Sequence, residues 1–251
     1  MGRLKNLIAA AFVTLSLAAN AGNDLFVLSG GAAKAALSDT LTEFKKLADH
    51  GIRAEYAPMG PLLEELGRGV EPDLLIVTAD VLPDLEQRGW ALPGTSVPLG
   101  SVGVGVAVRD GATVPDISTP EKLKAVLLAA RSITYIDPNK GTSGKHFSKV
   151  LRDLGIADAV KGKTMLVEGG YVVEAVARGE AEIGVQQITE ILPVAGVKLV
   201  GPLPDALQKW TTYVAVRTPY GNADGRVDRL WRYLQSPDSR SIFERRGFTV
   251  R

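Results

Sequence analysis

The segment ITYIDPNKGTSGKHFSKVLRDL, residues 133–154, shows the pattern that decides the predicted fold. It opens with four apolar, β-prone residues, 133–136, continues with a loop rich in glycine and hydroxyl side chains, and closes with the amphipathic spacing of a helix, 145–154. The same succession of strand, short loop and helix recurs along the chain. Such alternation predicts an α/β protein in which mixed, mostly parallel sheets are flanked by helices.

On both sides of this segment the sequence predicts further strands, more in total than one small sheet holds. The predicted strands are residues 25–28, 53–57, 74–77, 102–108, 133–136, 164–167, 183–185, 197–200 and 211–216. The predicted helices are 32–48, 61–67, 80–87, 120–130, 145–154, 172–177, 226–235 and 237–245. Two lobes with a ligand cleft between them suit this number of elements, although the length also permits one domain.

Glycine and proline gather around extended segments near residues 100–105 and 201–204. Two such places suit a chain that crosses twice between lobes. We therefore predict that lobe 1 comprises residues 22–101 plus 205–251, and lobe 2 residues 102–204.

The first residues have the features of a secretory signal peptide. Arg3 and Lys5 precede the apolar run 7–18, and Ala19-Asn20-Ala21 is a small-x-small cleavage site. The alternative, a membrane anchor, needs roughly 20 apolar residues, and this run is shorter. We expect cleavage after about Ala21, a periplasmic mature protein with no stable membrane insertion, and a monomer.

Composition excludes several classes of function. The chain has no cysteine, so we expect no disulfide and no lipid anchor on cysteine. Loss of Arg3 and Lys5 leaves 27 basic against 28 acidic side chains, a balance that argues against a nucleic-acid partner. The two histidines, His50 and His146, without cysteine clusters predict no metal site, and we expect no cofactor.

The loops that follow the strands carry the predicted ligand site. In open α/β sheets, ligands lie beyond the carboxyl ends of the strands, where helix N-termini present unpaired N–H groups and a partial positive charge. These loops are rich in glycine and polar residues and suit a small anionic ligand. The candidate ligand-binding residues are Ser29, Gly30, Gly31, Met59, Gly60, Thr78, Thr142, Ser143, Gly144, Gly169, Gly170, Tyr171 and Gln187.

For several candidates a purely structural role is the alternative. Ser29 suits a helix N-cap as well as a ligand donor, Tyr171 suits packing, and Gln187 suits solvent exposure. Lys145 and His146 suit a solvated first helical turn. The loop 137–146 can form a backbone nest for an oxyanion, but it lacks the full phosphate-loop pattern, which argues against nucleotide hydrolysis.

Several short motifs follow one another in a distinctive order. They are VLSGGA at 27–32, GVEPD at 69–73, DL at 84–85, DP at 137–138 with Gly144, GEAE at 179–182, LQSP at 234–237 and the ending at 242–248. In this order they resemble the molybdate-binding-protein-like group of bacterial extracellular solute-binding proteins over essentially the whole mature chain. The resemblance implies a type II periplasmic-binding fold, an anion held between the lobes by neutral donors, and an ABC transporter permease as partner.

Carried over position by position, the resemblance implies oxyanion donors at Ser29, the Met59-Gly60 turn, Ser143, Gly169 and Gln187. Two positions depart from the molybdate pattern, because Pro58-Met59-Gly60 replaces an expected hydroxyl and Gln187 replaces an expected tyrosine. A buried, doubly charged oxyanion needs a full set of donors. A di- or tricarboxylate therefore fits better than molybdate.

A second hypothesis belongs to a different functional class. The run QITEILP, residues 187–193, looks similar to that of periplasmic aconitate isomerases within the broader group. Such an enzyme moves an allylic proton, which requires a base near the acidic carbon and donors for the developing charge. The sequence suggests His146 or Lys145 as the catalytic group. We rank this enzyme below a binding protein.

Overall fold

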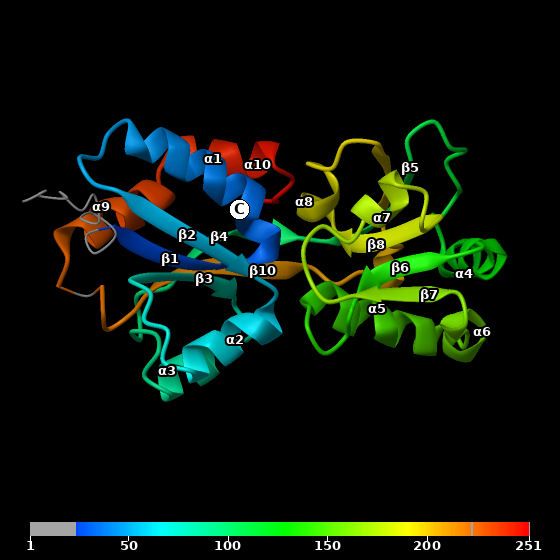
Figure 1. Ribbon diagram of the computed structural model, residues 1–251, viewed down its shortest axis with the longest axis horizontal. Helices are drawn as coiled ribbons and strands as arrows, with labels where there is room; N and C mark the ends of the chain where they lie inside the picture. Colours follow the sequence, from blue (N-terminus) through cyan, green and yellow to red (C-terminus); the bar gives the residue numbers. More distant parts are fainter. Residues whose placement is uncertain (1–23, 222, 251) are drawn as a thin grey trace, which may run out of the picture.

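The computed structural model describes residues 24–221 and 223–250 and contains two five-stranded sheets, each flanked by helices (Figure 1). The predicted α/β architecture is confirmed. The predicted signal peptide lies outside the described residues.

The first sheet, with its helices, is lobe 1. It contains β1 (Leu25–Gly30), β2 (Ile52–Ala57), β3 (Leu74–Thr78), β4 (Val97–Val102) and β10 (Thr211–Arg217), in the order β2-β1-β3-β10-β4. β1 pairs in parallel with both β2 and β3, and β10 runs antiparallel to β3 and β4. The carboxyl ends of β1, β2 and β3 therefore lie at one edge, the usual place for a ligand in such sheets.

The second sheet forms lobe 2. It contains β5 (Val104–Arg109), β6 (Ile133–Ile136), β7 (Thr164–Val167), β8 (Ile183–Gln187) and β9 (Val197–Pro202), in the order β7-β6-β8-β5-β9. β6 is parallel to β7 and β8, whereas β5 is antiparallel to β8 and β9. The two sheets thus share one plan, with a parallel trio that presents its carboxyl ends.

Helices cover both faces of each sheet (Figure 1). Lobe 1 has the 3-10 turn η1 (Gly31–Ala33), α1 (Lys34–Lys45), α2 (Met59–Gly67), α3 (Leu82–Gln87), α9 (Gly225–Leu234) and α10 (Pro237–Arg245). Lobe 2 has α4 (Pro120–Ala129), α5 (Thr142–Asp153), α6 (Ala157–Lys161), α7 (Glu174–Ala177) and α8 (Ile188–Ile191), and η2 (Asp205–Leu207) follows β9. Because strands such as β3 are buried on both faces, they read as continuous apolar runs. Among the described residues, no helix combines the length and apolar character needed to span a bilayer.

The chain crosses between the sheets at Gly103, the second residue of the predicted strand 102–108. Residues 104–108 of that prediction lie in β5, but its start is wrong, because Val102 ends β4, a strand of the other sheet that was not predicted. The valine and glycine alternation runs through the crossing, so the strand pattern does not mark the break, although glycine and proline near residues 100–105 favour a crossing there. The second crossing, after β9, is tied to the first by Gln208, whose amide accepts from Val104 N and donates to Val104 O, both at 2.9 Å. The lobe boundaries at 101/102 and 204/205 remain our proposal.

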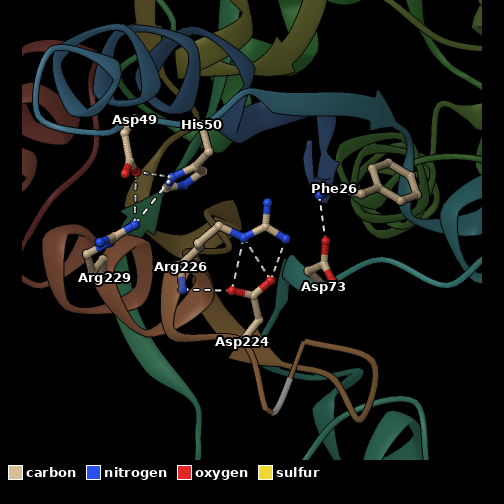
Figure 2. A network of polar contacts seen from close by, with 7 residues as sticks. All are labelled: Phe26, Asp49, His50, Asp73, Asp224, Arg226 and Arg229. Carbon is tan, nitrogen blue, oxygen red and sulfur yellow. Dashed lines mark hydrogen bonds and ion pairs between the residues drawn. The ribbon is translucent and has the colours of Figure 1, made fainter. Parts of the chain in front are cut away.

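A polar network holds the amino ends of the lobe 1 strands, far from the loops of interest (Figure 2). The N–H of Phe26 donates to Asp73 Oδ2 at 2.7 Å, which links β1 to the loop before β3. Asp224 caps α9 and binds Arg226, and Arg229 of α9 contacts Asp49 at 3.2 Å. Side chains thus bond to the backbone N–H groups of Phe26 and Arg226 and to one another at this end of the lobe.

The start of α5 allows a direct test of the fold. An alanine methyl at Gly144 would overlap the carbonyl oxygen of Ile136, at the end of β6. We expect Gly144→Ala to lower the free energy of unfolding by about 1–3 kcal/mol, because the backbone must shift to admit the methyl group. Urea denaturation of the mature protein measures this.

Gly162 provides the matched control. It has φ −70° and open space around its Cβ position. Gly162→Ala should leave stability unchanged or raise it by about 0.4–1 kcal/mol. A Gly144→Ala variant as stable as the wild type would contradict the packing of α5 on β6.

Candidate functional site

The loops at the carboxyl ends of the two parallel trios meet between the lobes. The N–H of Gly60, in the first turn of α2, donates to the carbonyl of Lys140 at 3.0 Å. From lobe 2, Ile188 at the start of α8 packs against the core of lobe 1, and its N–H donates to Gly103 O at 3.0 Å. The lobes are therefore closed on each other, and α8 lies between them (Figure 1).

Two small cavities lie at this junction and share Gly31, Pro58, Ile136 and Glu190; together we call them the inner chamber. Their volumes are about 80 Å³ and about 20 Å³. The larger is lined also by Lys34, Tyr56, Ala57, Gly170 and Tyr171. The smaller is lined also by Ala32, Met59, Gly141, Thr142, Ser143, Gln187 and Tyr213. Both lobes thus contribute walls to one enclosed space.

The helices that begin at the inner chamber have no side-chain caps. Gly141 precedes α5, Pro58 precedes α2 and Gly30 precedes η1, and none of these residues caps its helix with a side chain. By contrast, Thr119, Asp224 and Ser236 cap α4, α9 and α10. The first turn of α5 therefore offers its N–H groups and the positive end of the helix dipole to an anion.

Glu190 supplies an acid group to the inner chamber. It lies in α8, and a methyl group placed on Gly31 of lobe 1 would come within 2.9 Å of its Oε1 atom. Burial raises the pKa of Glu190 to about 8, opposed by hydrogen bonds from the Gln186 side chain and the Gln187 backbone. At neutral pH this carboxyl is mostly protonated, so it donates a hydrogen bond rather than repelling an anion.

Lys34 supplies a cation at the edge of the inner chamber. Its Nζ atom lies 5.3 Å from the ring centroid of Tyr171 in lobe 2 and 5.8 Å from that of Tyr56 in lobe 1. Both distances suit cation–π contacts, which hold the ammonium group between the lobes.

Tyr213 adds a phenol from β10. It is buried against Phe248, with ring centroids 5.9 Å apart. Burial, followed by the nearby Glu190 and Asp80, raises its pKa, so the phenol stays protonated. The inner chamber thus gains a hydroxyl donor from a strand that carried no predicted site residue.

The structure places seven of the predicted ligand-binding residues on the walls of the inner chamber. They are Gly31, Met59, Thr142, Ser143, Gly170, Tyr171 and Gln187. The buried Oε1 atom of Gln187 has no hydrogen-bond partner among the described residues. An acceptor left in this state costs free energy unless a donor reaches it.

Other predicted residues lie behind these walls. Ser29 is buried and its hydroxyl donates to Gly30 O at 3.1 Å, so it caps no helix. A methyl on Gly30 would meet Met59 and Tyr213 at 2.9 Å, and one on Gly169 would meet Pro58 at 3.2 Å. These glycines, like Gly144, permit close packing of the loops that form the site.

A larger cavity adjoins the inner chamber and contains the remaining predicted residues; we call it the lysine cavity. Its volume is about 380 Å³, and it shares Met59, Gly141 and Thr142 with the inner chamber. It is lined also by Gly60, Leu63, Thr78, Asp80, Val81, Pro138, Asn139, Lys140, Lys145, His146, Lys149 and Lys209.

His146, a predicted catalytic candidate, belongs to the lysine cavity and lines neither part of the inner chamber. Its Nε2–H donates to the carbonyl of Leu207 at 2.7 Å, which fixes the ring. Burial lowers its pKa, and the positive charges of Lys209 and Lys149 add to this effect. His146 is therefore neutral at pH 7, and Lys145 lies beside the same cavity.

A still larger hollow, about 740 Å³, lies in lobe 2 away from both cavities. Among its lining residues, Arg131 and Glu182 pair with each other at 3.1 Å. It receives no loop from lobe 1, so it does not fit the architecture of a site between lobes.

Among the lining residues of the inner chamber that were not predicted, Lys34, Glu190 and Tyr213 contribute its cation, acid and phenol groups. Lys34 begins a helix, and Glu190 lies in the run 187–193, which was noted for its resemblance without a role for its glutamate. Tyr213 sits in a strand whose carboxyl end is not at the cleft. The one signal in the sequence that could have identified Lys34 is its place near the start of a predicted helix, three residues after the candidate turn 29–31.

Comparison with known proteins gives a consistent family. Residues 25–249 match the model of a family described as bacterial extracellular solute-binding protein. Aconitate isomerase of Pseudomonas sp is 30% identical over 237 residues, covering 92% of this chain and 89% of that protein. The molybdate-binding protein ModA of Escherichia coli K12 is 26% identical over 254 residues, covering 98% of each.

Solved structures agree in fold. The periplasmic molybdate-binding protein of Azotobacter vinelandii superposes with a TM-score of 0.76 at 18% identity, covering 91% of this chain and all of that one. Peb3 of Campylobacter jejuni gives a TM-score of 0.67 at 14% identity, with 91% and 100% coverage. At these identities the likeness concerns the fold alone.

The raised pKa of Glu190 predicts a pH-dependent contribution to stability. Between the ordinary glutamate value of 4.5 and about 8, the folded protein keeps a proton that the unfolded chain has lost. The free energy of unfolding therefore falls as pH rises through this window, with a slope from this group of at most about 1.4 kcal/mol per pH unit, and levels off above it.

Glu190→Gln removes this titration. We expect the stability difference between wild type and variant to change steadily between about pH 5 and about pH 8, measured by urea denaturation. The exposed Glu174→Gln serves as the control. A constant difference between wild type and Glu190→Gln across this range would show that Glu190 is ionised in the folded protein.

Proposed function

Because the chain belongs to the bacterial extracellular solute-binding proteins, we propose that it captures a small di- or tricarboxylate anion in the inner chamber. The observation that carries this proposal is the meeting of three groups around one enclosed space. They are the uncapped start of α5, the ammonium of Lys34 and the protonated carboxyl of Glu190.

These groups match the chemistry of a carboxylate ligand. Helix N–H groups and Ser143 suit one carboxylate as donors, and Lys34 suits a second as a counter-charge. A protonated Glu190 suits a third as a carboxylic acid donor. Met59 and Ile136 provide apolar contact for the carbon skeleton between them.

Molybdate is a poorer match. A doubly charged tetrahedral oxyanion has no carbon skeleton, so apolar wall residues such as Met59 and Ile136 leave its oxygens without donors. In the molybdate pattern a tyrosine is expected where this chain has Gln187. Tyr213 replaces that hydroxyl donor only in part, because it approaches from β10 rather than from the end of β8.

The family also supports a setting for this capture. We propose that the mature protein works in the periplasm and delivers its ligand to an ABC transporter permease. We expect ligand entry to require the lobes to open, because both lobes line the inner chamber and its two parts measure only about 80 Å³ and about 20 Å³.

A thermal-shift panel with citrate, cis-aconitate, trans-aconitate, sulfate and molybdate tests the ligand class. Ligands that bind the folded protein raise its melting temperature by mass action. We expect the tricarboxylates to do so and molybdate not to. Lys34→Gln should weaken tricarboxylate binding at least about tenfold, because a charge-assisted hydrogen bond is lost.

Lys161→Gln, on the surface of lobe 2, is the matched control and should bind like the wild type. Stabilisation by molybdate alone would overturn the carboxylate assignment. Equal binding by Lys34→Gln and wild type would remove Lys34 from the site.

A second function, aconitate isomerisation, is favoured by Glu190 and by the 30% identity to an aconitate isomerase. We propose that the ionised fraction of Glu190 takes a proton from the CH₂ carbon of aconitate. The electron pair spreads over the allylic system and its carboxylates, and the proton returns to the former vinylic carbon. No oxidant or water is consumed, and the carboxyl is regenerated. This assignment replaces His146 and Lys145, which lie in the lysine cavity.

The rate of aconitate interconversion, followed by proton NMR, tests this second function. Glu190→Gln should lose at least about a hundredfold in turnover while it still binds the ligand, because a general base typically contributes that much. The wild-type rate should rise with pH up to about 8. Glu174→Gln should match the wild type. A wild type that binds aconitate without turnover is a pure binding protein, and a fully active Glu190→Gln would exclude Glu190 as the base.

A further inference from the structure

The lysine cavity is built from both lobes. From lobe 1, the lining residues are Met59, Gly60 and Leu63 of α2, Thr78 at the end of β3, and Asp80 and Val81 after it. The loop 138–141 and the first turns of α5 line it from lobe 2, and Lys209 reaches it from the second crossing. Its volume, about 380 Å³, is within the usual range for small-molecule sites.

Positive charge dominates its walls. Lys140, Lys145, Lys149 and Lys209 line the cavity, with Asp80 as the acidic group among the lining residues. Lys149 is paired with Asp153, whereas the ion pairs of the described residues leave the other three lysines without an acidic partner. What sets these lysines apart is that they line one cavity together.

The positive charges of these lysines also affect His146, which lines the same cavity. The imidazole of His146 has its pKa lowered partly by Lys209 and Lys149. It therefore does not add a positive charge to the cavity. A hollow with walls of one sign concentrates counter-ions of the other sign.

We propose that the lysine cavity is a second anion-binding site, separate from the inner chamber, that takes a compact polyanion and thereby holds the two lobes together. Asp80 offsets part of the charge of Lys140, Lys145 and Lys209, and the remaining positive charge attracts an anion with several charges more strongly than a monovalent one. The contact between Gly60 and Lys140 and the shared wall at Met59 and Thr142 separate the two sites.

The site has a consequence for closure. Because its walls belong to both lobes, a bound polyanion favours the closed arrangement over the open one by its differential affinity for the two states. It also offsets the mutual repulsion of the lysines that closure brings together. Binding in the lysine cavity and binding in the inner chamber therefore reinforce each other.

Isothermal titration calorimetry with inorganic pyrophosphate as the probe tests this site. Lys140→Gln/Lys209→Gln should weaken pyrophosphate binding at least about tenfold and leave tricarboxylate binding in the absence of pyrophosphate within about threefold. The control Lys45→Gln/Lys161→Gln removes the same charge from exposed positions elsewhere and should change pyrophosphate affinity by less than about twofold. Higher salt should weaken pyrophosphate binding to the wild type more than to Lys140→Gln/Lys209→Gln.

The outcomes separate this inference from the proposed function. No pyrophosphate binding to the wild type, or equal binding by Lys140→Gln/Lys209→Gln, overturns the second site. Loss of pyrophosphate binding in Lys34→Gln but not in Lys140→Gln/Lys209→Gln places the probe in the inner chamber and also overturns it. Pyrophosphate binding that depends on Lys140 and Lys209, in a protein that binds no tricarboxylate, supports the second site and overturns only the proposed function.

Discussion

The burial of Glu190 between the lobes is the constraint on which the rest of the site depends. Desolvation of the Glu190 carboxyl next to Gly31 raises its pKa more than the hydrogen bonds from Gln186 and Gln187 lower it. Protonation resolves this conflict and turns an acid into a hydrogen-bond donor, in a chamber whose other polar groups, the start of α5, Lys34 and Tyr213, also suit an anion. The same burial gives the residue a pKa near that required of a general base at neutral pH.

The enclosure itself comes from the topology. Each sheet presents the carboxyl ends of three parallel strands, and within residues 24–221 and 223–250 the chain passes between the sheets at Gly103 and at the segment after β9. Gln208 joins these two crossings through its hydrogen bonds to Val104. On the cleft side the loops at Gly60 and Lys140 contact each other, whereas the polar network of Figure 2 lies at the amino ends of the lobe 1 strands.

The sequence predicts the alternating elements and most of the strand ends, because buried parallel strands are apolar runs and glycine-rich loops follow them. The glycine and proline near residues 100–105 favour a crossing between lobes there, but the sequence does not predict that β4 ends at Val102, because the valine pattern continues from one sheet into the other. The sequence does predict Ser143, Tyr171 and Gln187 as site residues, because they lie in loops that follow predicted strands. Lys34, Glu190 and Tyr213 join them only through long-range packing, since α8 leaves its own lobe to contact lobe 1 and β10 returns to the first sheet late in the chain.

A crystal structure of the mature protein grown with a tricarboxylate such as citrate would test the inner chamber most directly. We expect closed lobes with the ligand in the inner chamber, one carboxylate at the N–H groups of Thr142 and Ser143, and another within hydrogen-bond distance of Glu190. Citrate bound elsewhere, or an inner chamber filled by protein side chains while citrate is bound, would contradict it.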